Sequence, residues 1–345
     1  MTVSSPLGRS GGVAEWDGNV RSVRELVVQL ARLRDPGAAA APTAVASVLN
    51  LVAVVDHVEA QMTEALIESM AGHQPSRSII VTRTSGGEGI DAHIETRHQP
   101  LAGDGGVLVE QVRLTLRGPV AARGVASAVE PLLRRDLPMF LWWPTAPAIG
   151  DEALEDLAEG AHRLITEAAR VGDACAAIEC LARWAGTGGP ALTDLSWAAL
   201  TPWRQLIAQL VEPDEIERLR RGSVAIIGHT GKKITVEALL VAGWLRETLG
   251  DRLMVEMHAR PDVAEGGLAS IELESTTGRR LTIELIPGRR SAAVTVSPSG
   301  PGVARRIMPL PVPDRATLLA GELEMARRDL PFEKALPFAR EFATR

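Results

Sequence analysis

The chain has 345 residues, of which 46% are hydrophobic and 23% charged, a balance that predicts a globular protein long enough for two domains and excludes a disordered chain. The net charge is −6, with −2 in residues 1–150, −6 in 151–222 and +2 in 223–345, so no part has the Lys/Arg surplus of a general nucleic-acid-binding protein. Aromatic residues are scarce, with no Tyr, four Phe and seven Trp, and most of the core must therefore be aliphatic.

The apolar runs and the cysteines indicate the compartment. The first residues lack the apolar run of a signal peptide, and the longest apolar stretch, about ten residues within 45–55, is too short to span a membrane. Two cysteines, Cys175 and Cys180, do not make the framework of a secreted disulfide protein. We therefore expect a cytoplasmic protein that does not enter a membrane.

Strand patterns alternate with helix patterns in the first half of the chain. Residues 1–19 are predicted to form a flexible tail, and 20–34 have the spacing of an amphipathic helix. The run 47–55 is apolar on both faces, which is typical of a buried parallel strand. Further strands are expected at 78–84, 91–98, 106–117, 139–143 and 162–169, and helices at 57–72, 120–135 and 151–160. The alternation predicts a mostly parallel α/β sheet with an inserted hairpin at 91–117.

The second half is predicted to be a helical segment followed by another α/β unit. Residues 174–221 are mainly helical in pattern, with Thr201 as an N-cap and Pro202 at the first helical position. A strand at 223–228 and a helix at 234–249 lead into four strands joined by tight turns, which predict an antiparallel meander, and two helices at 314–328 and 332–342 close the chain. The predicted organisation is a tail (1–19), an N-terminal α/β domain (20–172), a helical connector (173–222) and a mixed C-terminal α/β domain (223–345).

One turn has the position of an anion site. The segment GHTGKK lies between the strand at 223–228 and the helix at 234–249, where backbone N–H groups can hold a phosphate. It is not a Walker A loop, because the glycine spacing differs and a second lysine stands where Ser or Thr would bind magnesium. An ordinary strand–turn–helix is one interpretation, and the other is contact with an anion or a partner at Gly228, Gly231, Lys232 and Lys233.

No complete catalytic or metal-binding pattern is recognisable. The seven histidines lack zinc-site spacing, and the acidic stripe on 151–160 is typical of a solvated helix face. GRSGG at 8–12 fits G-x-S-x-G but lacks the flanking strand and helix that give this motif its meaning. Cys175 and Cys180 would lie on different faces of a helix, so two buried thiols are one interpretation and a redox switch the other. We expect no enzymatic activity, no cofactor and no metal.

Four of the seven tryptophans fall in two segments, DLPMFLWWP at 136–144 and DLSWAALTPWRQLIAQL at 194–210. Core packing is one explanation of this clustering, and a protein-contact surface, where Trp and Arg often dominate the binding energy, is the other. Because Trp142 and Trp143 belong to a predicted inner strand, we expect these two in the core. The candidates for contact with a partner are Trp197, Trp203 and Arg204.

Together with SVLNLVAVV (47–55), PSRSIIV (75–81), ALLVAGWLRETLG (238–250) and RRDLPFEKAL (327–336), the tryptophan segments resemble the glucose-6-phosphate dehydrogenase assembly protein family, OpcA, of actinobacteria and cyanobacteria. The resemblance runs over about 20–340. The family often has His where this chain has Gln74 before Pro-Ser-Arg. The resemblance implies a two-domain, non-catalytic protein that binds glucose-6-phosphate dehydrogenase and promotes its active oligomer, which supports NADPH supply by the oxidative pentose phosphate pathway.

Two variations on this function are open. One is a nucleotide- or sugar-phosphate-binding protein with weak or unknown enzymatic activity, which would use the strand–turn–helix at 223–249. The other follows from the thiol regulation associated with cyanobacterial members of the family, and it makes Cys175 and Cys180 the candidates for a thiol gate on partner binding.

Overall fold

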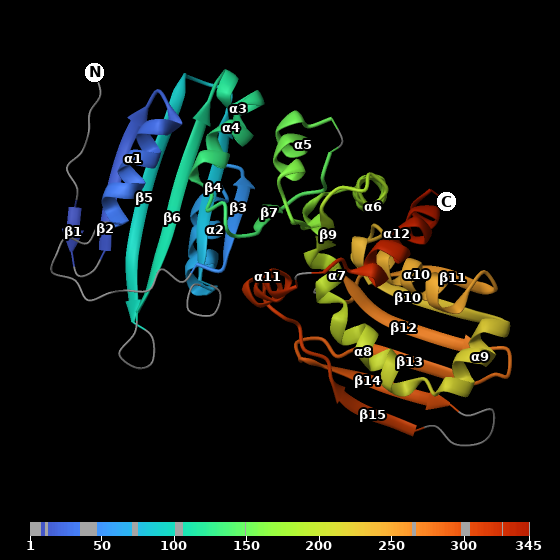
Figure 1. Ribbon diagram of the computed structural model, residues 1–345. Helices are drawn as coiled ribbons and strands as arrows, with labels where there is room; N and C mark the ends of the chain where they lie inside the picture. Colours follow the sequence, from blue (N-terminus) through green and yellow to red (C-terminus); the bar gives the residue numbers. More distant parts are fainter. Residues whose placement is uncertain are drawn as a thin grey trace.

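The computed structural model (Figure 1) describes residues 8–10, 13–34, 47–70, 75–100, 106–148, 150–263, 267–297, 304–325 and 327–344. They form a nine-stranded mixed sheet, here sheet A, and a six-stranded mixed sheet, sheet B, with helices packed on both. The strands of sheet A are β1 (Gly8–Ser10), β2 (Val13–Val20), β3 (Leu49–Val55), β4 (Ser76–Thr84), β5 (Gly89–Pro100), β6 (Gly106–Arg117), β7 (Met139–Trp143), β8 (Arg163–Thr166) and β9 (Ala191–Asp194).

Six strands of sheet A are parallel and lie in the order β6-β4-β3-β7-β8-β9, and β5 and β2 continue the sheet in antiparallel pairing beyond β6. The chain winds from β3 outwards to β4 and β6, and then returns to the other side of β3 for β7, β8 and β9. This is the order of a doubly wound sheet. The winding direction changes between β3 and β7, which are neighbours.

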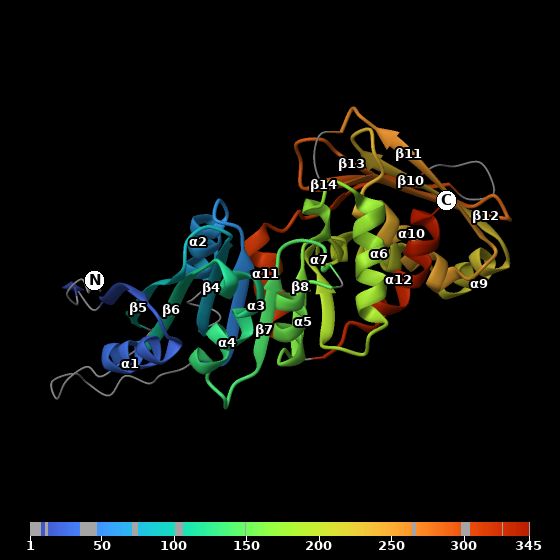
Figure 2. The ribbon, with the colours of Figure 1, turned by 90° about the horizontal axis from the view of Figure 1, so that it is seen from above.

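Both faces of the parallel part of sheet A are covered, which explains why β3 is buried along its whole length. Val52 and Val54 face a core shared with α1 (Val23–Arg34), α4 (Val125–Val129) and α5 (Glu152–Glu159). Leu51 and Ala53 face a second core with α2 (Ala60–Met70) and α11 (Arg315–Glu324). Figure 2 shows the two groups of helices on opposite sides of the sheet. A strand without a polar face is what the sequence of 47–55 predicts.

Sheet B has the order β11-β10-β12-β13-β14-β15, in which only the β10–β11 pair is parallel. Its strands are β10 (Ser223–Thr230), β11 (Leu253–Arg260), β12 (Leu268–Ser275), β13 (Arg280–Leu285), β14 (Ser291–Ser297) and β15 (Ala304–Pro309). Helices α10 (Val236–Leu249) and α12 (Leu330–Ala343) pack on one side of it, together with α6 (Ala174–Ala185) (Figure 2). The predicted fold class, a mostly parallel sheet with an inserted hairpin and a mixed sheet with an antiparallel meander, is confirmed. Sheet B has one more strand than expected, β15, and β11, which was expected in the meander, instead pairs in parallel with the other edge of β10.

Residues 13–19, predicted to belong to a flexible tail, are ordered in strand β2, which pairs with β5 from Val13 opposite Arg97 to Val20 opposite Ile90. Trp16 and Val20 point into the core and are 6% and 2% exposed. Their spacing follows the two-residue period of a strand. Residues 8–10 of the predicted tail form strand β1, which pairs with β2, and residues 1–7 and 11–12, including two residues of the GRSGG motif, lie outside the described residues.

One further expectation about a helix is wrong. The helix predicted at 120–135 is divided into α3 (Pro119–Arg123), α4 and a 3-10 turn at Glu130–Leu132, since Gly124 and Pro131 interrupt it. The predicted helical connector contains β9, which pairs with β8. The division of the chain into domains at 172 and 222 stays a prediction.

Thr201 does not cap its helix as predicted. Helix α7 (Leu195–Ala199) leads almost directly into α8 (Thr201–Leu210), and the N-cap is Leu200, whose backbone is itself helical. The Thr201 hydroxyl instead accepts a hydrogen bond of 2.9 Å from Arg204. A third helix, α9 (Pro213–Arg221), precedes β10. In the part of the chain that the structure describes, no helix is long and apolar enough to cross a membrane.

The close contact between α10 and α12 generates a stability prediction. A Cβ added at Gly243 would meet the backbone oxygen of Ala335 and would lie 2.6 Å from the backbone nitrogen of Ala339. We expect Gly243→Ala to lower the free energy of unfolding by about 2–3 kcal/mol, because backbone atoms cannot move aside. Gly321→Ala is the control, because a Cβ there meets nothing within 4 Å in the described structure. Its higher helix propensity should raise the free energy of unfolding by up to about 1 kcal/mol. Urea denaturation of both variants checks this, and equal stabilities would contradict the packing.

Candidate functional site

A pocket of about 490 Å³ opens where the parallel strands of sheet A end. The carboxyl ends of β3 and β7, the two strands between which the winding direction changes, contribute to its wall. In doubly wound sheets this crevice is where ligands bind, and the volume is in the range of about 300–1,000 Å³ that small-molecule sites occupy. We call it the switch-point pocket. Its polar and aromatic lining is formed by Asp56, Glu59, Arg83, Trp143, Thr145 and Arg170.

Arg83, near the end of β4, is fixed between a ring and a carboxylate. Its guanidinium carbon lies 5.0 Å from the centre of the Trp143 ring, and its two terminal nitrogens donate to the two carboxylate oxygens of Asp151 at 3.3 and 3.2 Å. Asp151 is also the N-cap of α5 and accepts the backbone N–H groups of Ala153 and Leu154. The carboxylate therefore holds the arginine and the helix end at once, which gives Arg83 a defined orientation at the pocket wall.

Arg170 is the second arginine of the pocket, at the end of a 3-10 turn that follows β8. It forms an ion pair with Glu59, and its Nε lies 3.9 Å from Glu167. Burial lowers the pKa of Arg170, and the positive charge of Arg315 lowers it further. Burial also raises the pKa of Glu167, although Arg315 donates to this carboxylate at 2.6 Å. Carboxylates from two elements therefore hold Arg170 beside the pocket.

The turn between β3 and α2 contains no glycine. It reads Asp56-His57-Val58-Glu59, and Asp56 accepts the backbone N–H of Glu59 at 3.0 Å. In dinucleotide-binding sheets the corresponding turn is rich in glycine, so that the pyrophosphate can approach the backbone at the start of the helix. Here an acidic side chain occupies one of those N–H groups, and this disfavours a pyrophosphate in that position.

Reasoning from the sequence did not find the switch-point pocket. None of the pocket arginines was among the expected site residues, because they belong to elements that come together only through the strand order. One signal was available: Asp56 and Arg83 are polar residues at the carboxyl ends of two strands with otherwise apolar centres. In a doubly wound sheet such positions converge on one edge.

The predicted partner-contact residues lie inside the molecule. Trp197 is completely buried and Trp203 is 7% exposed. The Trp197 Nε1–H donates to Asp329 at 2.8 Å, and the Trp197 ring lies 5.4 Å from the ring of Phe332. These contacts fill the space between α7 and α12, where a partner cannot reach them. Partner contact by Trp197 and Trp203 stays a prediction that this burial does not favour.

Arg204, the third predicted contact residue, stacks on the buried Trp197 ring at 3.7 Å. Burial lowers the pKa of Arg204 to about 10, against the opposing influence of Asp329. A similar arrangement occurs in the other tryptophan segment, where Arg315 lies 5.0 Å from the centre of the completely buried Trp142 ring. The expectation that Trp142 and Trp143 belong to the core is confirmed.

The predicted anion-binding residues are spread over a strand and a turn. Gly228 is inside β10, where a Cβ would collide with the Ser270 hydroxyl, and Lys232 and Lys233 are exposed in the turn that follows. The first N–H groups of α10 are already partly satisfied, because the Thr235 hydroxyl accepts from Ala238 at 3.3 Å. An anion at this helix end would also meet the carboxyl group of Glu237 in the first turn. Anion binding by Gly228, Gly231, Lys232 and Lys233 stays a prediction that this geometry does not favour.

Cys175 and Cys180 are both free thiols on α6 and both are partly buried. Burial raises the pKa of the Cys175 thiol, and the neighbouring Asp173 adds to this. A raised pKa leaves less thiolate at neutral pH and so reduces reactivity towards oxidants. A redox role of the two cysteines stays a prediction.

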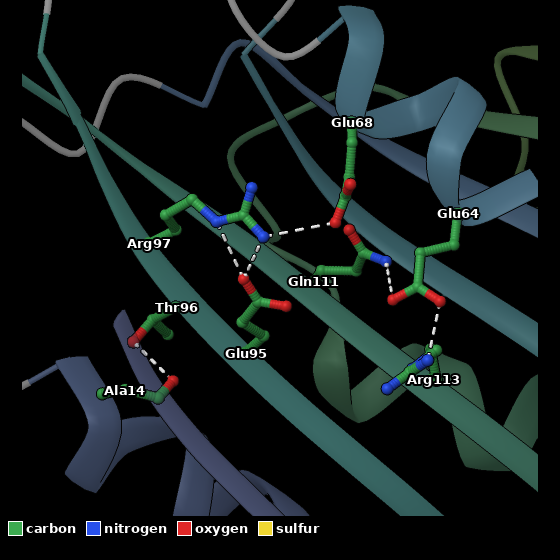
Figure 3. A network of polar contacts seen from close by, with 8 residues as sticks. All are labelled: Ala14, Glu64, Glu68, Glu95, Thr96, Arg97, Gln111 and Arg113. Atoms are coloured by element: carbon green, nitrogen blue, oxygen red, sulfur yellow. Dashed lines mark hydrogen bonds and ion pairs between the residues drawn. The ribbon is translucent and has the colours of Figure 1, made fainter. Parts of the chain in front are cut away.

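Three glutamates on one face of sheet A, Glu64, Glu68 and Glu95, bring carboxylate oxygens within 4.8 Å of one another, a spacing compatible with a metal ion. Arg97 donates to Glu95 at 2.6 Å and to Glu68 at 3.2 Å, and Arg113 pairs with Glu64 at 2.6 Å (Figure 3). Two guanidinium groups already offset much of the negative charge. The group is explained as an ion-pair network that holds α2 against β5 and β6.

Two models of one protein family match the chain, and together they include sheet A from β4 onwards and all of sheet B. Both are described as parts of a glucose-6-phosphate dehydrogenase subunit: its N-terminal domain matches residues 67–183, and its C-terminal domain matches residues 190–336. The chain belongs to the OpcA family. The resemblance seen in the tryptophan segments is thereby confirmed, and one of these segments lies in each matched region.

A protein of Synechocystis sp., named as the OxPP cycle protein OpcA, is 26% identical over 141 residues. The match covers 39% of this chain and 29% of that protein, so the chain spans less than a third of this OpcA relative. A crystal structure of the transcriptional regulator Gal80p from Kluyveromyces lactis covers 88% of this chain and 92% of its own at a TM-score of 0.44 and 9% identity. A likeness this distant carries no argument about function.

The switch-point pocket lies mostly in the region that matches the N-terminal OpcA domain. Arg83, Trp143 and Arg170 are within 67–183, whereas the turn at Asp56 precedes it. Strand β9, by contrast, belongs to the region that matches the C-terminal domain, although it completes sheet A.

Glu237 gives a pH-dependent prediction for this OpcA protein. Burial raises its pKa to about 7 from an ordinary value of 4.5, and Asp194 adds to the effect. The unfolded chain therefore loses this proton near pH 4.5 and the folded protein near pH 7, so that stability falls as the pH rises through this window. We expect Glu237→Gln to be about 2–3 kcal/mol more stable than the wild type at pH 8, and the difference to shrink towards pH 5.

Melting curves between pH 5 and 8 measure the effect. The exposed Glu324 on α11 provides the matched control, since Glu324→Gln should leave the pH dependence as it is. A Glu237→Gln protein whose melting temperature stays parallel to the wild type over this range would show that the carboxyl group is ionised in the folded state at pH 5.

A second prediction concerns the buried ring of Trp197. Trp197→Phe removes the hydrogen bond to the Asp329 carboxylate and reduces the stack with Arg204, and it should cost about 2–3 kcal/mol of unfolding free energy. Trp184 is the control, because it is 8% exposed and its Nε1 has no hydrogen-bond partner among the described residues. Trp184→Phe should therefore cost only about 1 kcal/mol from lost packing. Guanidinium denaturation compares the two, and equal losses would contradict a special role for the Asp329 contact.

Proposed function

We propose that the protein binds glucose-6-phosphate dehydrogenase and promotes the assembly of its active oligomer, and that it catalyses no reaction itself. The observation that carries this proposal is the pair of family matches, since the descriptions of both models name glucose-6-phosphate dehydrogenase. The name of the Synechocystis relative, an OxPP cycle protein, supports the same pathway. The protein would act in the cytoplasm and support NADPH supply.

The physical basis of such an effect is linkage. A protein that binds the active assembly of an enzyme more tightly than the inactive form shifts the population towards the active form. A difference of about 1–3 kcal/mol in binding free energy changes the equilibrium by roughly 5–150-fold. No chemical step by the binding protein is required, and the two proteins need only a surface that distinguishes the two states.

The alternative, a nucleotide- or sugar-phosphate-binding enzyme that uses the strand–turn–helix at 223–249, has less support. The α10 end is capped by Thr235 and has the carboxyl group of Glu237 in its first turn, which opposes an anion. A place for a small ligand exists instead in sheet A, where the switch-point pocket lies.

Size-exclusion chromatography of the two proteins together tests the proposed function. A mixture with glucose-6-phosphate dehydrogenase should elute earlier than either protein alone, and enzymatic activity across that peak should exceed that of the dehydrogenase at the same concentration. Trp197→Phe should behave like the wild type at a temperature where it stays folded, because Trp197 is inside the chain. Separate elution with unchanged activity at saturating concentration would refute the proposal.

A further inference from the structure

The switch-point pocket offers both hydrogen-bond donors and hydrogen-bond acceptors in its lining. Two arginines, Arg83 and Arg170, supply donors, and Asp56 and Glu59 supply acceptors. Trp143 adds an apolar surface. We propose that this pocket binds a small phosphorylated sugar, with its phosphate on the arginines and its hydroxyl groups on the carboxylates. This goes beyond the proposed function, which requires only a protein partner.

Arg83 and Arg170 have the orientation and accessibility that phosphate binding requires. A guanidinium group has five N–H donors, and Asp151 takes two of those of Arg83, so three remain. The Arg83 and Arg170 side chains are 32% and 36% exposed, which leaves each of them accessible from the pocket. Because carboxylates and the Trp143 ring already fix their positions, little side-chain freedom is lost when a ligand binds. Planar guanidinium groups held in this way match the oxygens of a phosphate.

The carboxylates of Asp56 and Glu59 favour a phosphate that is attached to a group with hydroxyls. Asp56 and Glu59 repel a bare anion, but an ionised carboxylate is a strong acceptor for the O–H groups of a sugar. The exposed hydroxyl of Thr145 can donate or accept at the same rim. A ligand that carries both an anionic group and hydroxyl groups satisfies both the arginines and the carboxylates, whereas inorganic phosphate or a neutral sugar satisfies only one of these groups.

A dinucleotide fits the pocket less well than a monophosphate. The turn from Asp56 to Glu59 lacks the glycines that admit a pyrophosphate, and the Asp56 carboxylate already accepts the backbone N–H of Glu59 there. The remaining donors belong to two side chains rather than to a row of backbone amides. This arrangement suits one compact phosphate group.

Isothermal titration calorimetry on the full chain, without the dehydrogenase, tests the proposal. The ligands are glucose 6-phosphate, glucose, inorganic phosphate and NADPH. Glucose 6-phosphate should bind at least about tenfold more tightly than phosphate, glucose should give no binding heat, and Arg170→Met should weaken glucose 6-phosphate at least about tenfold. Arg135→Met, which removes an exposed arginine outside the pocket, should leave the affinity unchanged.

Two variants with smaller structural changes separate an effect on binding from a loss of folding. Thr145→Val changes only an exposed rim hydroxyl and should weaken glucose 6-phosphate about two- to fivefold, and Arg170→Lys should retain part of the affinity. Melting temperatures confirm that each variant is folded. The proposal is overturned if glucose 6-phosphate does not bind, if Arg170→Met and wild type bind it equally, or if phosphate or NADPH binds as tightly. Since the dehydrogenase is absent, these outcomes leave the proposed partner function untouched.

Discussion

The indole ring of Trp197 joins the two halves of the molecule. It lies on α7 directly after the last strand of sheet A, and its Nε1–H donates to Asp329, which also caps α12. Phe332 packs beside the ring and Arg204 from α8 covers its face. Because α12 packs on α10 and α6, this contact fixes sheet A relative to the helices of sheet B. A charge-assisted hydrogen bond and an arginine stack on a completely buried ring are stronger constraints than the same contacts on an exposed surface.

The sequence was sufficient for elements whose own pattern decides their structure, and insufficient for elements that depend on neighbours. The run 47–55 is apolar at every position but two, Ser47 and Asn50, so its place in the middle of a covered sheet could be predicted. Strand β9 has only four residues and ends in Asp194, and it is a strand because β8 lies beside it. The strand at Val13–Val20 has a visible alternation, but it lacks the density of apolar residues that would outweigh its Gly and Asn.

In the candidate sites, too, the residues could be noticed from the sequence, but their contacts depend on the packing of distant elements. Composition could identify the tryptophan segments as unusual, and their letters could indicate the family, but Trp with a neighbouring Arg occurs both in interfaces and in interiors. Whether Arg204 faces solvent or the Trp197 ring is decided by the packing of α8 against α7 and α12, which no local pattern contains. Arg83 and Arg170 come together only because the strand order brings their strand ends to one edge, so their pairing requires the topology.

Strand β9 connects the two regions that the family models match. The N-terminal family region ends at 183 and the C-terminal one begins at 190, before β9 (Ala191–Asp194), so that the second region supplies the last strand of the first region's sheet. A chain divided at that point would give one fragment in which the edge of β8 that faces β9 is unpaired, and another with a buried strand that has no sheet to join. The two regions match separate sequence ranges, but in the folded protein β9 of the second region pairs with β8 of the first. The last strand of sheet A therefore depends on a segment from the second region, and the second region depends on sheet A to pair that segment.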